Sequence, residues 1–304
     1  MFRAAVTRQT TDRSAPTALT APVIAAVLTT VVAWASAFVA IRGIRGDFTP
    51  GALALGRLAT GAVALSVVVL IRRAWVRPTA REWGLLLVCG VMWFAIYNVA
   101  LNAAEQRIDA GTAAMLIAVG PVLIALLAGA LLGEGFPRWL LIGAGVAFAG
   151  AVLIGVATAR GATTDVIGAL LCLLAAVTWA IGVLAQKPVL RRLPALQVTQ
   201  IACTVGAIAC LPYAGQLIHD GRSASAGAIS ALVYLGLVPT AIAFVTWAYA
   251  LSRMDAGRLG VTTYLVPTMT VLIAWPVLGE VPPGLAIAGG ALALLGVGLT
   301  RRRR

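Results

Sequence analysis

The most evident shortage in this sequence is charge. Only 11% of its 304 residues are Asp, Glu, Lys or Arg, whereas a soluble domain has about 25%. Hydrophobic residues make up 61%, and the mean hydropathy is +0.98. This balance excludes a water-soluble globular domain and predicts an integral membrane protein. At about 20 residues per helical span, the chain has room for ten spans and for no soluble catalytic domain, so we do not expect an enzyme.

Side chains that build metal and cofactor sites are also scarce. His219 is the only histidine, and the glycines near residue 145 lack the GxGxxG spacing because Phe148 occupies the third glycine position. We therefore expect no metal, no cofactor and no nucleotide site. The four cysteines show no CxxC or Cys/His spacing and are predicted to be buried, unreactive thiols: Cys89, Cys172, Cys203 and Cys210.

The hydrophobic residues are gathered in long runs without charge. Each run is apolar all round and lacks the alternation of a strand, which is typical of a transmembrane helix. One run is interrupted only by Arg57. The fold class is therefore predicted to be all-α, integral to a lipid bilayer, with ten spans: 14–41, 48–71, 83–104, 110–133, 139–159, 166–186, 193–219, 223–252, 259–279 and 281–300.

The basic residues are divided unevenly between the two sides of these spans. The two tails and the even-numbered loops hold 17 Lys and Arg, and the odd-numbered loops hold five. The positive-inside rule then predicts that both termini are cytoplasmic, with Arg301 to Arg304 as an anchor. The formal charge of +13 belongs to loops and tails, so we expect the bilayer as a partner and no nucleic acid.

A short motif occurs twice at a fixed spacing. RIDAG at 107–111 recurs as RMDAG at 253–257, an offset of 146, and several prolines and glycines downstream recur at the same offset. Upstream, Trp34 matches Trp179 at an offset of 145. The repeat predicts two halves of five spans. The expected units are a disordered tail at 1–20, repeats at 21–158 and 164–300, and a basic tail at 301–304.

Five is an odd number, so the second half must enter the membrane from the opposite side. Two inverted halves can exchange conformations about an axis in the membrane plane and give alternating access to a site at midplane. The pattern therefore favours a transporter over a receptor or an enzyme.

Three segments carry a resemblance to a known family. They are WASAFVAIR at 34–42, ALGRLATGA around Arg57, and MLIAVGPVLIALLAGALLGE at 115–134 with its counterpart TYLVPTMTVLIAWPVLGE at 263–280. With these segments the chain resembles the EamA-type permeases of the drug/metabolite transporter superfamily. The resemblance implies an inner-membrane carrier with a central cavity between its halves, which exports small metabolites, often amino acids. It does not define the substrate.

Arg57 is the only charge well inside a span. An arginine at that depth costs about 2.5–3.5 kcal/mol on insertion scales, so it should face a polar cavity or protein. Two roles remain open: a cavity cation that meets a substrate carboxylate, or a structural arginine bound by carbonyls or a loop acid. Its counterpart in the second half is Ala202.

Other polar and aromatic side chains lie near the middle of spans. Trp and Tyr normally prefer the membrane interface, so at this depth they indicate a cavity that could hold a zwitterion with an apolar side chain; bundle packing is the alternative. The predicted substrate-binding residues are Trp34, Arg57, Trp93, Tyr97, Asn98, Trp179, Thr240, Trp247 and Tyr264.

Matching residues in the fourth, fifth, ninth and tenth spans suggest structural roles. Pro121 and Pro267 are candidate hinges, or else packing kinks. Glu134 and Glu280 are predicted to cap helix N-termini. Four glycines of the fifth and tenth spans give these helices small faces for close helix contact, either inside the chain or in a homodimer. They are Gly143, Gly150, Gly289 and Gly296.

All ten acids lie outside or at the edges of the charge-free runs. Proton-coupled carriers usually place a titratable group inside the membrane, so we expect facilitated or weakly coupled export. The predicted function is export of small organic metabolites, most of all amino acids. A multidrug or organic-cation exporter is the alternative within transport, and a non-transporting assembly factor or receptor is the alternative outside it.

Overall fold

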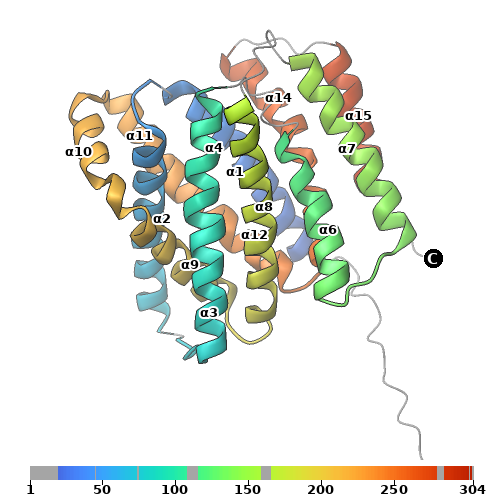
Figure 1. Cartoon of the computed structure of the whole chain (residues 1–304), viewed down its shortest axis with the longest axis horizontal. Coiled ribbons are helices and arrows are strands. Elements are labelled where there is room, and N and C mark those ends of the chain that lie inside the picture. Colours follow the sequence, from blue (N-terminus) through green and yellow to red (C-terminus); the bar gives the residue numbers. More distant parts are fainter. Residues whose placement is uncertain are drawn as a thin grey trace, which may run out of the picture.

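A computed structural model of the chain describes residues 20–44, 46–73, 75–107, 116–158, 166–278, 284–300 and 302. Within these ranges every regular element is a helix, and the helices lie side by side as one bundle (Figure 1). The helices of the first half are α1 (Ala21–Ile44), α2 (Pro50–Arg72), α3 (Ala80–Cys89), η1 (Gly90–Ile96), α4 (Tyr97–Glu105), α6 (Val119–Leu131) and α7 (Arg138–Thr158). Those of the second half are α8 (Val166–Val189), α9 (Ala195–Ala209), η2 (Leu211–Tyr213), α10 (Ala214–Ser223), α11 (Ala226–Leu235), η3 (Gly236–Ile242), α12 (Ala243–Leu251), α13 (Ala256–Thr262), α14 (Leu265–Leu278) and α15 (Gly284–Leu299).

Six described segments are long and apolar enough to cross a membrane, which makes the chain a multi-pass membrane protein. A seventh is formed if α9 and the bent segment after it are one span. The three remaining predicted spans appear as shorter apolar helices whose neighbouring residues lie partly outside the described ranges. The number ten and the orientation of the termini therefore stay predictions.

The predicted seventh span is bent instead of straight. Helix α9 ends at Ala209, and the chain turns by 51° into α10. Pro212 lies in the short η2 turn, where a residue without an amide proton cannot continue the α-helical hydrogen bonds. The ring of Tyr213 then packs against Gly51 on α2, where a Cβ atom would clash with it.

Two spans contain a π-helical segment that the sequence did not lead us to expect. Segments η1 and η3 start at Gly90 and Gly236 and end at Ile96 and Ile242, so both bounds differ by the repeat offset of 146. Helices α6 and α14 begin at positions with the same offset. The backbone irregularities are thus repeated together with the sequence.

The small residues of the fifth and tenth predicted spans face each other inside the chain. A Cβ atom at Gly143 would lie 2.6 Å from the carbonyl oxygen of Gly296, and one at Gly150 would lie 2.6 Å from that of Gly289. Helices α7 and α15 therefore lie side by side (Figure 1) in close backbone contact. These glycines serve internal packing, and the homodimer stays a prediction without their support.

The prediction for the cysteines is confirmed, because all four are buried and free. The predicted tails lie almost wholly outside the described residues.

Candidate functional site

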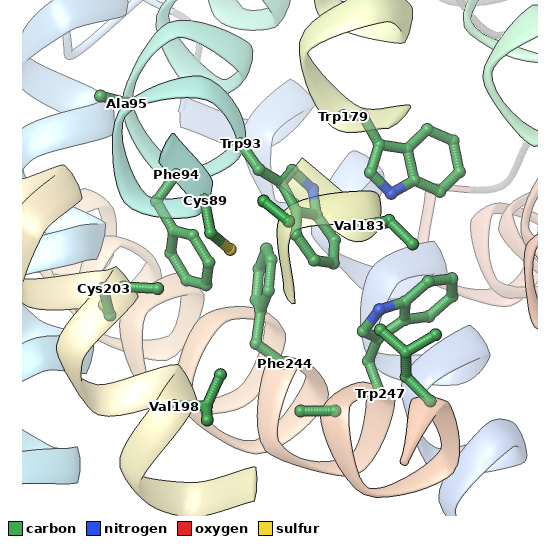
Figure 2. Close-up of a cluster of buried hydrophobic side chains, with 14 of the residues drawn as sticks. Cys89, Trp93, Phe94, Ala95, Trp179, Val183, Val198, Cys203, Phe244 and Trp247 are labelled. Atoms are coloured by element: carbon green, nitrogen blue, oxygen red, sulfur yellow. The ribbon is translucent and has the colours of Figure 1, made fainter. Parts of the chain in front are cut away.

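Aromatic rings from four helical elements meet inside the bundle. Figure 2 shows the rings of η1, α8 and α12. The ring centroid of Trp34 lies 5.1 Å from that of Trp247 and 5.5 Å from that of Phe244. It lies 6.3 Å from that of Trp93 and 6.4 Å from that of Trp179. We call this group the aromatic cluster, and its six members are Trp34, Trp93, Phe94, Trp179, Phe244 and Trp247.

Both predicted halves contribute to the aromatic cluster. The first half supplies rings from α1 and η1, and the second supplies rings from α8 and α12. Glycines make room for the indoles: a Cβ atom at Gly182 would meet Trp93, and one at Gly120 would meet the ring of Trp179. Because Trp34 and Trp179 are equivalent in the repeat and both belong to the cluster, the cluster lies where the two halves join.

Most rings of the aromatic cluster are buried, and Trp34 is partly buried. Trp93 and Trp247 are each 1% exposed, and Trp179 is 5% exposed. Aromatic pairs at these distances each contribute about 0.5–1.5 kcal/mol beyond the burial of their surface. Yet the indole Nε1 atoms of Trp179 and Trp247 are buried without a hydrogen-bond partner among the described residues. A buried donor without an acceptor costs about 1–3 kcal/mol, so packing is favourable here while polar pairing is incomplete.

Of the predicted polar site residues, Tyr97 and Asn98 contact members of this cluster, and Asn98 and Thr240 have their side chains hydrogen-bonded. The ring of Tyr97 lies 6.4 Å from that of Trp179. Asn98 donates from Nδ2 to the carbonyl of Phe94 at 2.8 Å. Thr240 donates from Oγ1 to the carbonyl of Leu235, also at 2.8 Å. Asn98 and Thr240 thus satisfy carbonyls within or next to the two π-helical segments, where the regular hydrogen bonding of the helix is disturbed.

Arg57 lies where α2 crosses η3 and is 6% exposed. Its Nε atom donates to the hydroxyl of Thr240 at 3.1 Å. Tyr97 and Glu105 are close enough to interact electrostatically with its guanidinium group. The arginine is therefore embedded in protein, and Tyr97 interacts both with it and with Trp179 of the aromatic cluster.

Tyr264 is not brought to the aromatic cluster. It belongs to a separate buried group, where its hydroxyl donates to the carbonyl of Ala118 at 2.9 Å. Ala118 is the repeat counterpart of Tyr264, so this bond joins equivalent positions of the two halves.

The predicted hinge residues lie near the starts of two helices, and one of the two predicted caps contacts a helix of the other half. Pro121 is the third residue of α6, and Pro267 is the third residue of α14. Both lie directly after a break in the span, where a missing amide proton is tolerated. The Glu134 carboxylate accepts from the amides of Ala256 and Gly257 at 2.8 and 3.1 Å, so it caps α13 of the other half and not the helix that follows it. Glu280 lies outside the described residues.

Polar contacts join the halves at the rims of the bundle. Arg192 forms an ion pair and hydrogen bonds with Glu82, which raise the pKa of the arginine. In the loop before α2, the amide and the hydroxyl of Thr49 donate to the Asp220 carboxylate at 2.8 and 2.9 Å.

Sequence reasoning missed three residues at the site. Phe94 and Phe244 read as ordinary apolar residues, and only the packing places them in the aromatic cluster. Gln186 on α8 is 0% exposed and has neither amide atom bonded among the described residues. An amide inside an apolar span was a signal that could have identified it.

Comparison with known proteins gives a consistent result. A model of the EamA-like transporter family matches residues 21–156 and again residues 166–302. A protein of Streptantibioticus cattleyicolor named "Probable terminal-alkyne amino-acid exporter" is 40% identical over 282 residues, covering 91% of this chain and 93% of that one. A "Probable amino-acid metabolite efflux pump" of Salmonella typhimurium is 26% identical, with 89% and 91% covered.

A solved crystal structure shares the fold, with a TM-score of 0.77 at 23% identity, over 92% of this chain and 96% of the other. The family model covers nearly the whole chain in two copies. The chain is therefore a member of the EamA-like transporter family, a multi-pass membrane transporter and not an enzyme.

Proposed function

We propose that this transporter exports small amino-acid-like metabolites across the bacterial inner membrane, by alternating access between two inverted five-span halves. The aromatic cluster carries the proposal. It is formed by both halves at their junction, and it contains the equivalent pair Trp34 and Trp179. A site with these properties can open to either side as the halves rock.

The chemistry of the cluster suits an apolar or aromatic amino acid. Indole faces bind ammonium groups through cation–π contact and apolar side chains through burial. The relatives named as exporters of amino acids or their metabolites support the same substrate class. In the described helices the acidic residues lie near helix ends and outside the aromatic cluster, which supports facilitated or weakly coupled export.

Counterflow into proteoliposomes tests the proposal. Vesicles loaded with unlabelled substrate are given labelled amino acids, L-propargylglycine as a terminal-alkyne amino acid, organic cations and nucleotide sugars, with and without a pH gradient. We expect saturable exchange of amino acids that responds little to the gradient. Trp34→Ala should abolish it, and Trp275→Ala, at a half-exposed tryptophan of α14, should not.

Two other outcomes would reject this function. Gradient-driven uptake of organic cations without amino-acid exchange would indicate a multidrug exporter. No flux of any solute from correctly folded protein would indicate a non-transporting membrane protein.

A further inference from the structure

Three buried polar side chains near the aromatic cluster lack hydrogen-bond partners among the described residues. They are the indole Nε1 groups of Trp179 and Trp247 and both amide atoms of Gln186. An indole N–H is a donor only, and a glutamine amide offers both a donor and an acceptor. Leaving such groups unpaired in an apolar interior is costly. Two of these three side chains belong to the same helix, α8, and the third is in ring contact with one of them.

Most other buried polar side chains of the described bundle form hydrogen bonds, although single atoms of Asn102, Gln200, Arg258 and Thr268 also lack a hydrogen-bond partner. Gln197 is 1% exposed, and its amide binds both the N–H and the carbonyl of Val76, at 3.0 and 2.6 Å. Asn98 and Thr199 bind backbone carbonyls. Gln186, by contrast, is the one buried glutamine in the described residues with both ends of its amide unbonded.

The two unpaired indole groups lie close together. Figure 2 shows the nitrogens of Trp179 and Trp247 on the inner sides of their rings, toward Trp93, with Val183 between the two indoles. The two ring centroids are 6.3 Å apart, so a carboxylate could accept one hydrogen bond from each N–H once the Val183 side chain moves from between the rings as the cluster opens. Gln186 lies seven residues after Trp179, on the same face of α8 and one turn beyond Gly182 and Val183.

We infer that these three side chains form the head-group site for a zwitterionic amino acid. The indole N–H groups of Trp179 and Trp247 donate to the substrate carboxylate, and Oε1 of Gln186 accepts from the substrate ammonium group. The inference rests on the proposed function and assigns the polar contacts within the same site. It gives the carboxylate a partner other than Arg57, whose Nε is already bonded to Thr240.

The test uses four related compounds as competitors in counterflow of labelled L-propargylglycine. Unlabelled L-propargylglycine has both charged groups, and its α-amide has no carboxylate. Pent-4-ynoic acid has no ammonium group, and but-3-yn-1-amine has no carboxyl group. Ratios of half-inhibitory concentrations then report recognition of each group separately.

In the wild type we expect the amino acid to compete best. Replacing both indoles by benzene rings, Trp179→Phe with Trp247→Phe, should lower the preference for the amino acid over its amide by about tenfold, since each variant loses an N–H donor to a charged group. Gln186→Leu should lower the preference for the amino acid over pent-4-ynoic acid by about tenfold. Two variants outside the site should leave both ratios unchanged. They are Trp275→Phe on α14 and Gln216→Leu on α10, where Gln216 accepts a hydrogen bond from Thr49 at the rim.

Indole signals of wild-type protein labelled with ¹⁵N-tryptophan provide a measurement that needs no variant to fold. Of the eight tryptophans, two should give indole N–H signals that shift with L-propargylglycine and with pent-4-ynoic acid but not with but-3-yn-1-amine. Absence of such shifts, or unchanged ratios in folded variants, overturns the inference. If the wild type exchanges no amino acid at all, the proposed function fails instead.

Discussion

The two places where a π-helical segment crosses a helix of the other half have the same backbone and different chemistry. A Cβ atom at Gly236 on η3 would lie 2.8 Å from the carbonyl oxygen of Arg57, and one at Gly90 on η1 would lie 2.8 Å from that of Ala202. Arg57 and Ala202 are equivalent in the repeat. The close approach of the helices has therefore been duplicated.

The side chains at the two crossings differ. At the first crossing Arg57 donates to Thr240. At the second, the equivalent positions hold Ala202 and Phe94, both 0% exposed and part of the main hydrophobic core. We call these the polar crossing and the apolar crossing. The difference shows that a duplicated scaffold can keep its packing while only one copy carries a buried charge.

The strongest test of this comparison puts a second arginine into the apolar crossing. Ala202→Arg should abolish folded protein, because the new charge costs about 2.5–3.5 kcal/mol in the membrane and meets Phe94 instead of a hydroxyl group. The measurement is the yield of monodisperse protein in detergent. Adding Phe94→Thr should restore part of that yield, and equal yields with and without it would show that the hydroxyl is irrelevant.

Matched glycine substitutions test the shared backbone. Gly90→Ala and Gly236→Ala should each lower the free energy of unfolding by about 1–3 kcal/mol, because each new Cβ atom meets a backbone oxygen. Thermal unfolding in detergent compares the two. A large loss of stability from one glycine substitution and none from the other would contradict the equivalence of the crossings.

Substitution of the arginine by lysine tests the polar crossing alone. Arg57→Lys should slow amino-acid exchange by about tenfold while the protein still folds, because an ammonium group lacks the Nε–H donor that meets Thr240 and the planar fork of the guanidinium. Initial counterflow rates at equal protein density give the answer. Full activity would show that the geometry of this donor does not matter.

Substitutions at the rims of the bundle should have the smallest effect on stability. Glu82→Gln removes the ion pair with Arg192 on the segments that lead into η1 and α9. Asp220→Asn weakens the acceptor of Thr49 just before α2. Exposed ionic contacts contribute little to stability and are screened by salt, so both melting temperatures should stay near that of the wild type. A large drop in melting temperature from Asp220→Asn alone would show that the two crossings also differ at the surface of the bundle.

Much of the site could be predicted from the sequence because its signals are local. Trp34, Trp93, Trp179 and Trp247 are anomalous at mid-span depth whatever surrounds them, and the structure brings all four together. Tyr264 carried the same signal but lies in another cluster, since depth along a helix does not say which way a side chain faces. Gln186 was not predicted, because an uncharged amide is a weaker anomaly inside a span than a charged group.

The sequence by itself determined that the chain enters a membrane, that it is internally repeated and which residues are too polar for a lipid-facing position. Hydropathy, charge and spacing are properties of single segments, so they can be read without a partner. Only the tertiary structure decided that α7 packs on α15, that Glu134 caps α13 and that Arg57 binds Thr240. These contacts join residues more than 100 positions apart, and their geometry depends on how whole helices fit against one another.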